Sequence, residues 1–216
     1  MPKTIIYLIR HAETVGNAEG IIQGQTIGGK LSKHGIRQAW ALGKWAEKNK
    51  IDVVYSSTLS RAVETAKIAF PNAQLRQMDG LMEQDAGELS AKTVEEAFKT
   101  FHKMHLSGAQ EPEHVIDYYL LRYGHELGGE SAKDVQERGM KALEEIAKAN
   151  EGKSVAVVAH GNLIKCILCE ILGTPLSHEN FRKMIQENCG INTITYSQED
   201  GFAVESINYA GHLSGQ

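Results

Sequence analysis

Short apolar runs alternate with longer amphipathic stretches along the whole chain. The runs are rich in β-branched residues, as buried strands are, whereas the stretches repeat apolar residues every three or four positions, as helices do. The expected strands cover residues 4–9, 51–55, 74–76, 154–159, 191–196 and 202–207. Only a short polar segment ending in Gly201 separates the last two, so we expect them to form an antiparallel hairpin.

Capping residues indicate where several of the amphipathic stretches begin. Ser32 predicts the N-cap of a helix whose apolar stripe includes Trp40. The segment Ser56-Ser57-Thr58 offers caps for the next helix. Ser131 with Asp134 resembles a capping box for a later one.

Strands and helices that alternate with short connections predict an α/β fold, specifically a three-layer α/β/α sandwich with a mostly parallel sheet. A single domain is expected over residues 1–216. Two apolar helical pieces, at 94–101 and 115–123, are separated by a break that includes Pro112. We interpret residues 92–127, approximately, as a helical insertion beside the functional edge of the sheet.

Composition limits the partners that the chain can have. Of its 216 residues, 42% are hydrophobic and 23% charged, the profile of a globular protein with one sizeable core. The net charge of -4 provides no basic field of the kind that nucleic-acid binders and proteins of anionic membrane surfaces require. We therefore expect neither nucleic acid nor membrane as a partner. No apolar run has the length of a membrane span or of a signal-peptide core.

The cysteines favour a reducing compartment. Three cysteines, an odd number, do not make a disulfide framework, so we expect a cytoplasmic protein. Cys166-Ile167-Leu168-Cys169 has the spacing of a redox dithiol, but it lies within an apolar helical pattern. The expected role is therefore that of two small core thiols.

Two histidines occupy positions just beyond expected strands, where open α/β sheets bind ligands. Arg10 and His11 follow the first strand, and His160 follows residues 154–159. A neutral imidazole can attack phosphorus, and a neighbouring guanidinium disfavours imidazolium and binds phosphate oxygens in bidentate fashion. Arg61 lies in a helical first turn, where the macrodipole disfavours a cation unless an anion binds there. Each of these residues, taken alone, is more often a solvated surface residue.

Four motifs follow one another along the chain, at the expected strand ends and in an acidic loop between them. They are Arg10-His11-Ala12-Glu13-Thr14 with Asn17, Ser56-Ser57-Thr58-Leu59-Ser60-Arg61-Ala62 with Thr65-Ala66, Glu83, and His160-Gly161. Together they resemble the histidine phosphatase superfamily, which includes the cofactor-dependent phosphoglycerate mutases. The resemblance covers nearly the whole chain.

The resemblance implies a role for each motif residue. His11 is implied as the phosphorylated nucleophile and Glu83 as the proton donor. The implied phosphate-binding residues are Arg10, Arg61, His160 and Asn17. No metal and no cofactor are implied, because two guanidiniums and an imidazole can offset the charge of a phosphate dianion without magnesium.

Within this family, the sequence favours hydrolysis over phosphoryl transfer between acceptors. A mutase has to hold a bisphosphate in a closed site, which requires extra cations. Residues 84–127 contain four lysines or arginines against eight acidic residues, and the run after Glu83 resembles the phosphatase branch. We expect a metal-independent phosphomonoesterase that hydrolyses a small phosphorylated metabolite through phosphohistidine. Phosphoglycerate mutase is the alternative, and a non-catalytic phospholigand-binding module is a third, less favoured one.

The insertion is expected to select the substrate, because aromatic and cationic residues gather on one of its segments. The candidate substrate contacts are Gln23, Gly24, Gly161, Tyr118 and Arg122. The apolar and aromatic positions of the segment have core packing as their alternative role. The sequence leaves the oligomeric state open, with a homodimer as one candidate.

Overall fold

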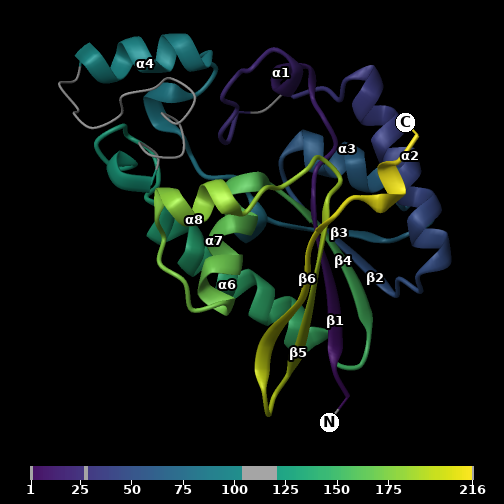
Figure 1. Cartoon of the computed structure of the whole chain (residues 1–216). Helices are drawn as coiled ribbons and strands as arrows, with labels where there is room; N and C mark the ends of the chain where they lie inside the picture. Colours follow the sequence, from purple (N-terminus) through teal and green to yellow (C-terminus); the bar gives the residue numbers. More distant parts are fainter. Residues whose placement is uncertain (1, 27–28, 104–120, 216) are drawn as a thin grey trace.

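Six strands form one mixed sheet in the computed structural model, which describes residues 2–26, 29–103 and 121–215 (Figure 1). The strands are β1 (Thr4–Arg10), β2 (Val53–Ser57), β3 (Leu75–Met78), β4 (Ser154–Ala159), β5 (Ile191–Ser197) and β6 (Gly201–Tyr209). Their order across the sheet is β3-β2-β4-β1-β5-β6. The first four are parallel, whereas β5 pairs antiparallel to β1 and forms the expected antiparallel hairpin with β6 at the edge of the sheet. The mostly parallel sheet is thus confirmed.

Helices cover both faces of the sheet, which confirms the three-layer α/β/α arrangement. The described α-helices are α1 (Val15–Ala18), α2 (Lys33–Lys48), α3 (Ser60–Ala69), α4 (Val94–Lys103), α6 (Ala132–Ala149), α7 (Gly161–Ile171) and α8 (His178–Lys183). Helices α2 and α3 pack on the face that Ile9 and Val158 present, and α6 and α7 pack on the face of Leu8 and Val157. Strand β4 is buried along nearly its whole length because both of its faces are covered.

Parallel strands bring the functional residues to one edge of the sheet. Arg10, the last residue of β1, pairs with Ala159 at the end of β4. The end of β2 lies beside the same part of β4, because Ser56 pairs with Val158. The loops that begin there therefore converge, as open α/β sheets require of a ligand site.

Two local expectations about helices are corrected by the structure. Trp40 is 60% exposed and so does not belong to the buried stripe of α2. The serines before α3 do not cap it, because β2 extends to Ser57 and buries both of them, which leaves Leu59 as an N-cap without a side-chain bond. Ser131, by contrast, forms the expected capping box at the start of α6.

The expected insertion is described only in part. Helix α4 lies within it, and residues 121–123 are helical, but Tyr118 and most of the second helical piece fall outside the described residues. A separate apolar cluster joins α4 to the loops beneath it through Ile22, Leu89, Phe101 and Leu127. Where the chain is described, no helix is long and apolar enough to cross a membrane. The three cysteines are buried and unpaired, as expected of core thiols.

Candidate active site

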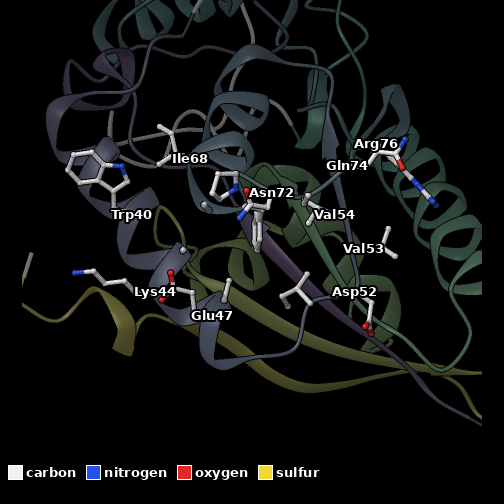
Figure 2. A pocket seen from close by; sticks show the side chains of 17 residues that line it. Trp40, Lys44, Glu47, Asp52, Val53, Val54, Ile68, Asn72, Gln74 and Arg76 are labelled. Atoms are coloured by element: carbon white, nitrogen blue, oxygen red, sulfur yellow. The ribbon is translucent and has the colours of Figure 1, made fainter.

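The end of β1, the segment from α1 to residue 24, helix α3, the loop after β3 and the first turn of α7 surround a pocket of about 260 Å³. The sequence-predicted residues among those that line it are Arg10, His11, Asn17, Gln23, Gly24, Arg61 and Glu83. A larger cavity of about 700 Å³ lies elsewhere, between α2, α3 and the start of β2 (Figure 2). It contains none of these residues, and Lys44 and Glu47 at its rim offset one another in charge. The smaller pocket is therefore the candidate active site, because it holds the reactive groups.

The hydrogen bonds of His11 define which of its ring nitrogens is nucleophilic. Nδ1 lies 2.8 Å from the carbonyl oxygen of Ala12, which can only accept a hydrogen bond, so Nδ1 carries the proton. Nε2 then has a lone pair, and it accepts a hydrogen bond from Nε of Arg61 at 3.3 Å. Because the side chain of His11 is buried in the pocket wall, Nε2 is the nitrogen presented for attack.

Burial and positive charge keep both site histidines neutral. Burial lowers the pKa of His11 well below its usual value, and the guanidiniums of Arg61 and Arg10 lower it further. The pKa of His160 is lowered for the same reasons, with burial as the largest cause. A neutral imidazole is the form that a nucleophile needs.

Arg61 is a buried cation with an unused donor. Its side chain is 1% exposed, Nη2 donates to the carbonyl of Gly24 at 2.7 Å, and Nη1 has no partner among the described residues. No acidic side chain of the described chain forms a salt bridge with it. A buried cation is costly unless it is paired, so this arrangement indicates that an anion completes the site.

His160 adds two further donor or acceptor atoms. Its ring lies 5.1 Å from that of His11, between centroids, and is fully buried. Neither ring nitrogen has a hydrogen-bond partner in the described part of the structure. His160 directly follows β4 and is the N-cap residue of α7, but its side chain does not cap the helix. His160 is not itself among the residues that line the pocket, but it lies directly behind His11, which is.

Arg10 is oriented by a segment that the sequence did not single out. Its Nη1 donates to the backbone carbonyl of Gln186, whose side chain is paired with Asn192. The side chain of Asn188 donates to the carbonyl of His11 at 2.9 Å. The segment between α8 and β5 therefore fixes the side chain of Arg10 and the backbone of His11.

Glu83 faces the pocket from the loop after β3, with its carboxylate at the start of α7. Oε1 accepts backbone N–H bonds from Gln84 at 2.9 Å and Leu163 at 3.1 Å. Oε2 accepts one longer bond, at 3.3 Å, from the N–H of Asn162. Oε2 thus retains more lone-pair capacity and is the oxygen better placed to carry a proton.

Arg138 and Glu130 hold the Glu83 loop, and sequence reasoning missed both. Arg138 donates to the carbonyls of Gly80, Met82 and Glu83 at 2.7–3.1 Å. Its guanidinium also forms a bidentate pair with Glu130 at 2.7 and 2.8 Å. Arg138 is about one-fifth exposed, so the pair is shielded and its geometry is well defined.

The remaining predicted residues have varied surroundings. Asn17 uses its side-chain oxygen to cap α1 and lines the pocket, which leaves its NH₂ group for a ligand. Gln23 has a buried Oε1 without a partner among the described residues, and Gly24 supplies the carbonyl that holds Arg61. Gly161 begins α7 beside the side chain of Arg10. Arg122 lies over the Tyr123 ring and does not line the pocket.

Comparison with known proteins identifies the family. The family model described as histidine phosphatase superfamily (branch 1) matches residues 6–210. The chain belongs to this superfamily. It is 32% identical to a metal-independent phosphoserine phosphatase of Arabidopsis thaliana, over 98% of this chain and 84% of that protein. It is 31% identical to the probable phosphoglycerate mutase GpmB of Klebsiella pneumoniae, over 96% of this chain and 94% of that protein.

Solved structures of this superfamily share the fold. YhfR of Bacillus stearothermophilus superposes with a TM-score of 0.83 at 27% identity, covering 97% of this chain and 99% of the other. A phosphoserine phosphatase from Entamoeba histolytica, a mutant in complex with phosphoserine, gives a TM-score of 0.78 at 28% identity over 97% and 99% of the two chains. The superfamily thus accounts for the whole sheet and its covering helices.

The two neutral histidines predict a pH dependence of stability. In the unfolded chain they titrate near the ordinary value of 6.5, whereas in the folded chain their pKa values lie well below it. As pH falls below 6.5, the unfolded chain binds protons that the folded chain does not. The free energy of unfolding should then fall by up to about 1.4 kcal/mol per pH unit for each histidine. Urea unfolding between about pH 7.5 and 5.5 measures this slope, and His160→Gln should remove the share of one histidine from it; an unaltered slope would contradict the assignment. The partly buried His212, whose pKa burial also lowers, adds to the slope of both chains equally.

Glu83 and Arg138 should affect the same step of the reaction. Glu83→Gln removes the proton needed by a basic leaving oxygen, so formation of phosphohistidine from alkyl phosphates should slow by about 10²–10⁴-fold and from aryl phosphates far less. Arg138→Met misplaces the Glu83 loop and should produce the same selective loss, about 10–100-fold on alkyl phosphates. Single-turnover quenching of both variants with both ester classes tests this. Lys141→Met, an exposed position on α6, is the matched control. Equal slowing of both ester classes would show that neither residue acts through proton donation.

Proposed function

We propose that this protein is a metal-independent phosphomonoesterase that hydrolyses a small phosphorylated metabolite through a phosphohistidine on His11. The observation that carries the proposal is the pairing of a neutral nucleophile with a buried guanidinium that has no salt bridge among the described residues. Nε2 of His11 has its lone pair toward Arg61, and Nη1 of Arg61 is buried without a partner among the described residues. A phosphate dianion supplies both the electrophile and the missing charge.

The first step transfers the phosphoryl group to His11. Phosphate oxygens take over the donors of Arg61, Arg10 and the ring of His160, which frees the lone pair on Nε2. Nε2 then bonds to phosphorus while the bond from phosphorus to the leaving oxygen breaks. A proton on Oε2 of Glu83 passes to that oxygen, and the alcohol departs. The guanidiniums offset the charge on the equatorial oxygens throughout.

The second step returns the enzyme to its starting state. Glu83, now a carboxylate, takes a proton from water as the water oxygen attacks phosphorus, and the bond between phosphorus and Nε2 breaks. The released imidazole keeps its proton on Nδ1, because the carbonyl of Ala12 still accepts it. One residue thus serves as acid and then as base, since the second step is chemically the reverse of the first with water in place of the alcohol.

Phosphoglycerate mutase is the second candidate, because relatives include the probable mutase GpmB. A mutase must retain a bisphosphate, which requires cations for both phosphates. Among the described residues lining the pocket, Arg10 and Arg61 are the cations, and both face the first phosphate. The side toward α4 is lined by Ile21, Ile22 and Val94. This lining supports hydrolysis over transfer to a second acceptor.

The fate of the phosphoryl group separates the two functions. Enzyme phosphorylated with a labelled aryl phosphate should release most of its label as inorganic phosphate, even when a large excess of 3-phosphoglycerate is present. His11→Ala, which lacks the nucleophile, should form no labelled protein. Label that passes mainly to the phosphoglycerate would establish a mutase. The absence of any labelled protein with every ester tried would instead favour a non-catalytic phospholigand-binding module.

A further inference from the structure

A second cavity, of about 440 Å³, adjoins the phosphate pocket and shares Arg10, Glu83 and Asn162 with it. It lies between the first turns of α7 and the end of α8, which are neighbours in the fold (Figure 1). We call it the α7–α8 chamber. Its other lining residues are Gly161, Lys165, Phe181, Arg182, Ile185 and Gln186.

The lining of the chamber includes more cationic side chains than that of the phosphate pocket, whose cations are Arg10 and Arg61. The described lining of the chamber includes the cations Arg10, Lys165 and Arg182 against one carboxylate, that of Glu83. The ammonium group of Lys165 lies 5.4 Å from the centroid of the Phe181 ring, so a cation–π contact holds this charge against the wall. Arg182 extends the positive surface outward along α8, where it is exposed to solvent.

The position of Glu83 connects the chamber to the leaving group. The leaving oxygen has to lie within hydrogen-bonding distance of the Glu83 carboxyl group in order to receive its proton. The alcohol half of the substrate therefore begins at the boundary between the two cavities. From there it can extend along the uncharged wall of Ile21 and Val94, or into the chamber toward Lys165 and Arg182. An anionic alcohol gains electrostatic energy only along the second path.

We propose that the α7–α8 chamber binds a carboxylate carried by the alcohol half of the substrate, with Lys165 and Arg182 as its cationic contacts. The proposal rests on the phosphomonoesterase function and assigns its substrate to phosphate esters of short hydroxy acids. A carboxylate fits better than a second phosphate, because a second dianion would be repelled more strongly than a monoanion by the phosphate that is being transferred. Lys165 and Arg182 bind and orient the ester and take no part in proton transfer.

Two pairs of substrates isolate the carboxylate. Phosphoserine differs from phosphoethanolamine by its carboxylate, and 3-phosphoglycerate has a carboxylate where glycerol 3-phosphate has a hydroxymethyl group. The natural chain should have the higher kcat/KM for the acid in each pair, and the preference should weaken as salt is added. Changing both Lys165→Met and Arg182→Gln should lower the ratio of the two kcat/KM values by about 2- to 30-fold, since exposed ion pairs contribute modestly.

Control variants and outcomes separate this proposal from the proposed function. Lys165→Arg together with Arg182→Lys keeps both charges and should retain most of the ratio, and Lys44→Met, in the remote cavity of Figure 2, should leave it unchanged. A ratio near one in the natural chain, or one that the Met and Gln changes do not lower, would overturn the carboxylate site. In either case phosphohistidine that forms from an aryl phosphate and then releases inorganic phosphate would show that the phosphomonoesterase function stands. Failure to form phosphohistidine from any ester would overturn that function instead.

Discussion

The contact between Arg61 and His11 is the interaction on which the site depends. A buried guanidinium donates to a buried imidazole at 3.3 Å, and no carboxylate of the described residues forms a salt bridge with it, although the charge of Glu83 acts on it from a distance. The contact has two effects. Together with burial, which is the larger cause, it keeps the pKa of the imidazole low, and it leaves a buried guanidinium without a salt bridge that an incoming anion can complete. The free protein therefore bears a desolvation cost that phosphate binding removes, which is a preorganised form of electrostatic catalysis.

The sheet and its covering helices hold Arg61 and His11 in contact, because they fix the loops at one edge of the sheet. The parallel strands β1, β2 and β4 end side by side, so residues distant in sequence meet there. Side chains outside the pocket also hydrogen-bond to backbone carbonyls of these loops, or the reverse. Arg138 holds the Glu83 loop, and the segment containing Gln186 holds Arg10. Both supports act on backbone groups, so they tolerate changes in the loop side chains while preserving its position.

Much of this arrangement could be predicted from the sequence, for a physical reason. Buried parallel strands are recognisable in a sequence as apolar runs, and the residue that follows each run lies at the ligand-binding edge of the sheet. The proximity of His11 and His160 was therefore predictable. The exposure of Trp40 was not, because helical spacing does not tell which residue at the margin of an apolar stripe is covered. Arg138 and Glu130 carried no local signal either, since the backbone groups that they hold in the Glu83 loop lie about fifty residues away in the chain. Only the folded loop reveals their role.

The nitrogen atom that carries the phosphoryl group tests the account most directly. Enzyme labelled with ¹⁵N in its histidines, phosphorylated by an aryl phosphate and quenched without acid, can be analysed by phosphorus–nitrogen correlation NMR, with His11→Ala as the reference. The hydrogen bond from Nδ1 to the Ala12 carbonyl predicts phosphate on Nε2 of His11. Phosphate on Nδ1 of His11, or on His160, would contradict the assigned tautomer and with it the role given to Arg61.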